Sequence, residues 1–156
     1  MTKTQLQTLA EMKEHLHISH SQIFSYLNCP LKYMFQYVQG RPPERVSVAL
    51  PFGTAIHAGL ELYYQSHMTQ RKIAKPSVVE ECFADSFSEA LSKADAPILY
   101  KKDENMESLL DMGKAMIKTF CRNVGLKNTE VMGAEIPLIG RLYTDDGNPT
   151  DFAVIG

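Results

Sequence analysis

Residues 18–38 read ISHSQIFSYLNCPLKYMFQYV, and the pattern of this stretch determines the predicted fold more than any other. Ser19 and Gln22 have the spacing of a capping box, in which each side chain accepts a hydrogen bond from the other residue's backbone N–H. Because Pro30 is tolerated only in the first turn of a helix, two helices are predicted to meet at Cys29. They run from Ser19 to Asn28 and from Pro30 to Val38, and share an apolar stripe of Ile23, Leu27, Leu31, Met34 and Val38.

Apolar residues recur at helical spacing in four further segments, which are therefore predicted to be helices. These segments are 6–16, 54–67, 79–91 and 109–124. Toward the C-terminus, the turn sequence DDGN at 145–148 separates an aliphatic, β-branched segment at 131–143 from a second strand at 152–155. The sequence thus predicts an α+β fold, helical over 1–125, with its first strands in 129–156 forming a β-hairpin.

The composition predicts one globular domain, because 44% of the 156 residues are hydrophobic. No segment approaches the roughly 18 apolar residues of a membrane span, and the polar start differs from a signal peptide, so a cytoplasmic protein without membrane contact is expected. The net charge of -2 gives no general attraction to nucleic acid. Residues up to Lys72 carry seven bases and four acids, against nine and fourteen in the remainder, so DNA contacts are expected mainly in the first half.

Residues 52–61 read FGTAIHAGLE and contain a histidine near the start of a predicted helix. His57, Glu61 and Tyr64 are spaced by four and three residues, so they share one helix face, away from the apolar stripe. In a functional interpretation, His57 binds a metal ion and Glu61 or Tyr64 orients its ring. Without further context, a histidine at such a position is more often a capping or surface residue.

The stretches 18–38 and 52–61 resemble the opening signatures of RecB-family nucleases of the PD-(D/E)XK superfamily, including RecB, AddB and CRISPR-associated RecB-like nucleases. The first resembles a Ser-x-Ser start, a helix, Cys-Pro and aromatic residues around a basic one. The second resembles the motif Gly-x-x-[Ile/Val]-His. The resemblance implies an α/β restriction-endonuclease-like fold in the intact domain and a metal-dependent DNA exonuclease or repair nuclease that uses Mg²⁺ or Mn²⁺. It also implies a helicase or recombination partner.

The same resemblance implies that His57 is a catalytic residue and a metal ligand. Glu135 falls in a predicted strand, where the family often has a glutamate, so it is a second candidate for both roles. A carboxylate buried in so apolar a stretch needs a metal or another partner. Glu135 therefore either extends the metal site beside His57 or faces solvent on alternate strand positions.

In the family, a strand reading Gly-x-[Ile/Val]-Asp and a strand carrying Asp/Glu-x-Lys come next, and Val154-Ile155-Gly156 resembles the start of the first. Residues 1–156 are therefore expected to be the N-terminal part of one nuclease domain. Hydrolysis needs further carboxylates and a lysine, so this chain is expected to be inactive alone. An unfinished sheet would leave the last strand with an unpaired edge, which predicts self-association through strand exchange.

The first stretch also contains candidate ligands and DNA contacts. In part of the family, a cysteine at the place of Cys29 joins three later cysteines around an iron–sulfur cluster. Cys82 and Cys121 fall on apolar helix faces, where small buried thiols are common. Among the basic residues, Lys32, Arg41 and Arg45 are the predicted DNA contacts, while the aromatic Phe35 is expected inside with Leu31 and Val38.

Two other classes of function compete with an active nuclease. One is a nuclease-like domain that has lost catalysis and serves as a DNA-binding or assembly module beside a helicase. The other is a helical DNA-binding domain, which the modest charge disfavours and which would bind DNA in a salt-dependent manner without metal.

Overall fold

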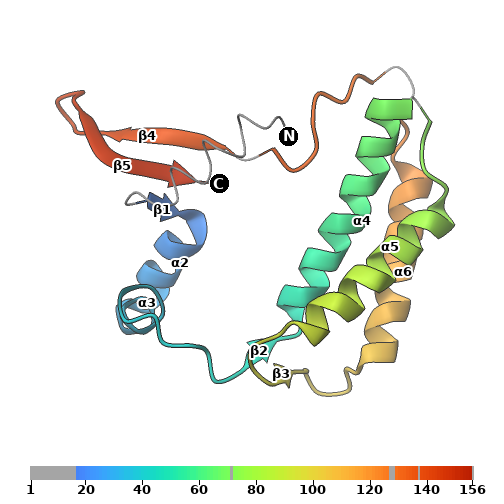
Figure 1. Cartoon of the computed structure of the whole chain (residues 1–156), viewed down its shortest axis with the longest axis horizontal. Helices are drawn as coiled ribbons and strands as arrows, with labels where there is room; N and C mark the ends of the chain where they lie inside the picture. The colour runs from blue at the N-terminus through green and yellow to red at the C-terminus, as the bar shows by residue number, and fades with distance from the viewer. Residues whose placement is uncertain (1–16, 71, 127–128, 137, 156) are drawn as a thin grey trace. The chain divides into compact units, whose positions relative to one another are not determined.

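The computed structural model describes residues 17–70, 72–126, 129–136 and 138–155 (Figure 1). The chain divides into two compact units, one of residues 1–42 with 136–156 and one of residues 43–135. We call the first the strand unit and the second the helical unit. The helix predicted at 6–16 lies outside the described residues. No described helix has the length and apolar character needed to cross a membrane.

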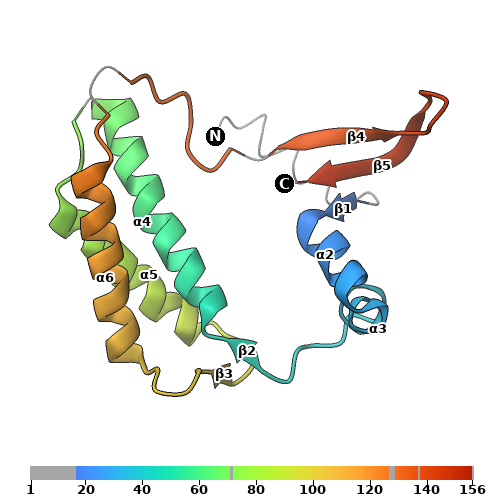
Figure 2. The ribbon, with the colours of Figure 1, turned by 180° about the vertical axis from the view of Figure 1, so that it is seen from behind.

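The helical unit consists of three helices that lie side by side in both views (Figures 1 and 2). They are α4 (Ala49–Gln70), α5 (Pro76–Ser92) and α6 (Met106–Asn123). Two short strands, β2 (Val46–Ser47) before α4 and β3 (Ile98–Leu99) after α5, pair in parallel. All three helices are confirmed, although α4 begins five residues earlier than predicted because Pro51 is tolerated in its first turn.

Aromatic rings form the centre of the helical unit. Phe83 and Phe87 on α5 are fully buried and stacked at 5.9 Å, and Phe52 on α4 meets both edge-on. At the other end of α4, Tyr63 is buried and its hydroxyl donates a 2.8 Å hydrogen bond to the carbonyl oxygen of Val124. This core holds α4 rigidly, and α4 carries His57.

The strand unit contains a three-stranded sheet and a broken helix. Its elements are β1 (His17–Ser19), α2 (His20–Asn28), α3 (Pro30–Tyr33), the π-helix η1 (Met34–Val38), β4 (Ile139–Tyr143) and β5 (Pro149–Ile155). The capping box is confirmed, because the Ser19 N–H donates to Gln22 Oε1 at 2.6 Å and the Gln22 N–H donates to Ser19 Oγ at 3.2 Å. The break at Cys29 is confirmed by its extended backbone (φ -160°, ψ 99°).

The sheet corrects the prediction that the last strand has an unpaired edge. Its order is β1-β5-β4, so β5 lies between two neighbours (Figure 1). β4 and β5 form the predicted antiparallel hairpin, and β1 adds in parallel with Ile18 opposite Val154. A strand of three residues, so distant in sequence, has no local pattern that would predict this pairing. Because β1 pairs with β5, the basis for strand exchange through β5 is removed.

The apolar stripe of the broken helix is also different from the prediction. Leu31 and Val38, expected inside, are 55% and 68% exposed, and Ile23 and Leu27 are exposed as well. Phe35 is half-buried, beneath the guanidinium of Arg41. Helical spacing shows which residues share a face, but it does not show whether another layer covers that face.

Candidate active site

His57 projects from the N-terminal half of α4 on the face opposite the core. Its neighbour Ala55 is fully buried and Ile56 packs against the core cluster, whereas the His57 side chain is 68% exposed. Helix geometry accounts for this difference, since residues one and two positions apart point to different faces. The sequence FGTAIHAGLE therefore presents an imidazole to solvent from a rigid helix.

Glu135 meets this imidazole from the segment that follows α6. Its Oε1 atom lies 2.8 Å from Nδ1 of His57, although the two residues are 78 positions apart. Both belong to the helical unit. A protonated Nδ1 donates a hydrogen bond to the carboxylate at this distance, which fixes the orientation of the ring.

Glu135 does not lie in a strand as predicted. The first strand after α6 is β4, which begins at Ile139, and the backbone at Glu135 is left-handed (φ 51°). A residue other than glycine pays about 1–2 kcal/mol to adopt this conformation. Such strain persists where surrounding structure imposes it, and here it accompanies the approach of the carboxylate to His57.

A surface hollow of about 620 Å³ surrounds the pair of His57 and Glu135. It is lined by Ala49, Leu50, Gly53, Thr54, His57, Ala58, Glu61 and Glu135. Glu61 lies one turn after His57, as predicted, and its Oε1 accepts a 2.6 Å hydrogen bond from Nε2 of Gln65. The hollow thus combines one imidazole with two carboxylates, the nitrogen and oxygen ligands that suit Mn²⁺ and, for the oxygens, Mg²⁺.

The pair fits one side of a metal site. Neighbouring ligands of an octahedral ion with bonds of about 2.1 Å lie about 3 Å apart, close to the 2.8 Å between Nδ1 and Oε1. Within the described ranges, no group of three or more His, Cys, Asp or Glu residues is arranged to hold a metal ion. His57 and Glu135 could therefore supply two ligands of such an ion, provided that the ion replaces the proton that Nδ1 and Oε1 share in the hydrogen bond.

The second residue proposed to orient His57 has a different place. Tyr64 packs against the core, with its ring 5.6 Å from Tyr63 and 6.0 Å from Phe120. The orienting hydrogen bond of His57 comes instead from Glu135. Tyr64 does share a face of α4 with His57, because seven residues make about two helix turns. At the C-terminal end of α4, however, α6 covers this face.

The predicted DNA contacts are distributed over both units. Lys32 on α3 is exposed, and Arg41 places its guanidinium carbon 4.6 Å from the Phe35 ring centre, a cation–π contact. Arg45 is also exposed, but it belongs to the helical unit, just before β2. Lys32 and Arg41 therefore share a unit, and Arg45 is a separate candidate.

Sequence reasoning missed one polar group of the strand unit. Ser25 is nearly buried, yet its hydroxyl has no hydrogen-bond partner among the described residues. The available signal was the helical spacing of Ser21, Ser25, Asn28 and Lys32, which indicates a polar stripe.

The three cysteines are free thiols. Cys29 is exposed, whereas Cys82 and Cys121 are half-buried on α5 and α6, and Cys82 Sγ donates to the Ala58 carbonyl at 3.7 Å. Cys82 and Cys121 are thus partly buried, rather than fully buried as their apolar helix faces suggest. The described part of the chain contains no cysteine cluster that supports iron–sulfur ligation by Cys29.

The thiols are expected to differ in reactivity toward iodoacetamide. Burial, followed by the negative charge of Glu80, raises the pKa of Cys121, so less of its reactive thiolate is present near neutral pH. In the folded protein, Cys29 should be alkylated at least about tenfold faster than Cys121, measured by peptide mass spectrometry. In urea the rates should become similar. Equal rates in the folded protein would contradict the burial of Cys121.

Comparison with known proteins gives one match. The sequence profile of the PD-(D/E)XK nuclease superfamily matches residues 17–148. Neither the curated proteins nor the solved structures contain a significant match to this chain. The matched range includes both motif stretches, His57 and Glu135.

Proposed function

The chain belongs to the PD-(D/E)XK nuclease superfamily, and from this premise we propose that it contributes His57 and Glu135 to the metal site of a DNA-cleaving nuclease. One observation carries the proposal. Two side chains 78 residues apart converge to 2.8 Å in a solvent-open hollow of the helical unit. Nucleases of this superfamily typically use Mg²⁺ or Mn²⁺.

The chemistry assigns a distinct task to each residue. When bound, Mg²⁺ or Mn²⁺ polarises a phosphoryl oxygen and makes a coordinated water a better nucleophile. His57 supplies a neutral nitrogen ligand, which favours Mn²⁺ over Mg²⁺. Glu135 supplies an oxygen ligand with negative charge, once the metal ion replaces the proton between its Oε1 and Nδ1 of His57. Glu61 lines the same hollow, where it attracts a cation.

The finer assignment rests on the RecB-like signatures. The order of residues 18–38 and 52–61 supports an exonuclease or repair nuclease acting on DNA, with a helicase or recombination protein as its partner. Aromatic residues around Lys32 and the motif that ends at His57 are the features that favour this subgroup over other members of the superfamily.

The proposed function is tested by cleavage of labelled DNA with the full-length gene product. Cleavage should require Mn²⁺ or Mg²⁺ and stop in EDTA, and His57→Ala should lower the rate at least about 100-fold through loss of a ligand. His67→Ala is the matched control, because His67 also lies on α4 but its Nε2 faces the Thr129 carbonyl at 3.2 Å. Cleavage unchanged in His57→Ala would refute the proposed site.

A second candidate function is a non-catalytic nuclease-like module. It is favoured by the absence, among the described residues, of any third ligand arranged with His57 and Glu135. DNA binding by the full-length product, with no cleavage in either metal ion, would support this alternative over the nuclease.

A further inference from the structure

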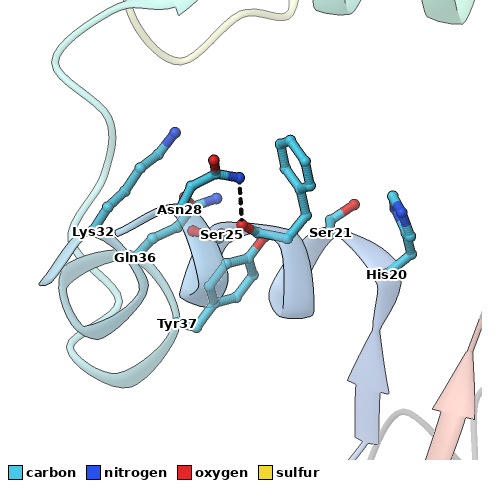
Figure 3. A pocket seen from close by; sticks show the side chains of 8 residues that line it. His20, Ser21, Ser25, Asn28, Lys32, Gln36 and Tyr37 are labelled. Atoms are coloured by element: carbon cyan, nitrogen blue, oxygen red, sulfur yellow. Dashed lines mark hydrogen bonds between the residues drawn. The ribbon is translucent and has the colours of Figure 1, made fainter. Parts of the chain in front are cut away.

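A second surface hollow lies in the strand unit, along α2, α3 and η1. Its volume is about 540 Å³ (Figure 3). Its floor is a polar stripe of Ser21, Ser25, Asn28, Lys32 and Gln36. Ser21, Ser25 and Asn28 recur at helical spacing and share one face of α2. Lys32 and Gln36 line the same hollow from α3 and η1, beyond the break at Cys29. We call this hollow the α2 groove.

Ser25 is the feature of the α2 groove that points to a ligand. It is 9% exposed, and its Oγ has no hydrogen-bond partner among the residues that the structure describes. Some helical hydroxyls do find a partner in their own helix: those of Thr54 and Thr119 each donate to the carbonyl four residues earlier. A buried polar group without a partner is rare in folded proteins, and a ligand or water commonly satisfies it.

The charge of the α2 groove favours an anion. Among the described residues that line it, Lys32 is the one Lys or Arg and none is acidic. The groove also begins at His20 and Ser21, the first residues of the nine-residue helix α2, where the helix dipole favours negative charge. The hollow around His57 differs, since it contains two carboxylates. The α2 groove thus suits a phosphate, whereas the hollow around His57 suits a metal cation.

Aromatic rings flank the polar stripe. The His20 ring stacks on Phe24 at 6.2 Å with an interplanar angle of 16°, and Phe24 is 62% exposed. Tyr37 lines the groove beside Gln36 (Figure 3). An exposed ring beside a phosphate-binding stripe suits a base that is not paired, because the faces of bases in a duplex are already stacked.

We propose that the α2 groove binds the backbone of single-stranded DNA, with Lys32 and Ser25 contacting phosphate oxygens and Phe24 stacking on a base. This inference rests on the proposed function for its choice of DNA. It does not depend on the metal ligands, because His57 and Glu135 belong to the other unit. Ser25 Oγ has almost no accessible surface in the free protein, so its hydroxyl donates to the phosphate only after the side chain rotates toward the groove.

The test measures binding of fluorescein-labelled oligothymidylate to the full chain. Binding is monitored by fluorescence anisotropy in EDTA at several salt concentrations. Phe24→Ala should weaken binding about tenfold through lost stacking. Lys32→Gln should weaken it about fivefold and reduce the salt slope by about 0.7, the value for one phosphate contact on a single strand. Lys118→Gln, an exposed lysine on α6, is the matched control and should leave both quantities unchanged.

Ser25→Ala separates binding from folding. It should weaken binding about tenfold, because a hydrogen bond to a charged acceptor is lost. It should not lower the Tm, since the hydroxyl has no partner to lose in the free protein. Wild-type affinity in Ser25→Ala and Phe24→Ala, or tighter binding of a duplex of equal length, would overturn the proposal.

The result is distinguishable from failure of the proposed function. His57→Ala should bind oligothymidylate with wild-type affinity in EDTA. A wild-type product that binds oligothymidylate through the groove residues but shows no metal-dependent cleavage would reject the nuclease site and support the α2 groove. Metal-dependent cleavage that requires His57, with no effect of the groove variants on binding, would reject the groove alone.

Discussion

Gly113→Ala is expected to destabilise the helical unit by about 3 kcal/mol, the cost of a severe overpacking in a tight core. A Cβ atom at this position on α6 would lie 2.1 Å from Cζ of Phe83. The Phe83 ring cannot move aside easily, because it is fully buried and stacked against Phe87. The chain has no tryptophan, so urea unfolding is best followed by far-UV circular dichroism.

Gly53→Ala provides the matched control for this prediction. Gly53 is also helical, but a Cβ atom there would meet nothing within 4 Å. The substitution should therefore stabilise the protein by up to about 1 kcal/mol, the difference in helix propensity between alanine and glycine. Adding Phe83→Leu to Gly113→Ala should recover part of the lost stability. A Gly113→Ala protein as stable as Gly53→Ala would show that α5 and α6 do not approach as described.

His57→Ala is expected to lower the affinity of the chain for Mn²⁺ by about 100-fold, because it removes a metal ligand. Isothermal titration calorimetry measures this affinity directly and does not require cleavage. Glu135→Gln should cost about tenfold, since the amide keeps the size of the side chain but removes the negative charge. The two effects should be less than additive in the double variant, because the side chains are in contact.

His67→Ala is the control for the metal titration. This residue shares α4 with His57, and its Nε2 lies against the Thr129 carbonyl. Its replacement should leave the Mn²⁺ affinity within about twofold of the wild type, since positioning effects on metal sites start at about tenfold. An equal loss in His57→Ala and His67→Ala would assign Mn²⁺ binding to another part of the chain.

The helices of this protein are predictable because their signals are local. The capping box at Ser19 and Gln22 and the proline at position 30 specify where α2 and α3 begin. The period of 3.6 residues predicts α5 and α6, and Leu109 and Gly113 in the segment predicted at 109–124 are buried. The period does not distinguish the adjacent apolar residues Met116, which is exposed, and Ile117, which is buried. Where two apolar residues are adjacent, the sequence pattern does not show which one enters the core. Packing of α6 against α5 determines it.

The sheet and the site depend on contacts between distant residues, and these were predicted less well. The pairing of β1 with β5 joins residues more than 130 positions apart through three residues. The left-handed backbone at Glu135 has no signature in an aliphatic stretch that otherwise favours a strand. His57 was identified through its motif, whereas the hydrogen bond that brings Glu135 to it arises only when the segment after α6 folds back along α4.

The central claim is that His57 and Glu135 form one side of a metal site, and paramagnetic broadening by Mn²⁺ tests it most directly. The chain has five histidines, whose ring Cε1–H signals can be assigned by substitution and followed during the titration. The account predicts that the His57 signal broadens first at substoichiometric Mn²⁺, that Glu135→Gln weakens this effect, and that the His67 signal stays sharp. Broadening that spares His57, or that reaches His57 and His67 at the same Mn²⁺ concentration, would contradict it.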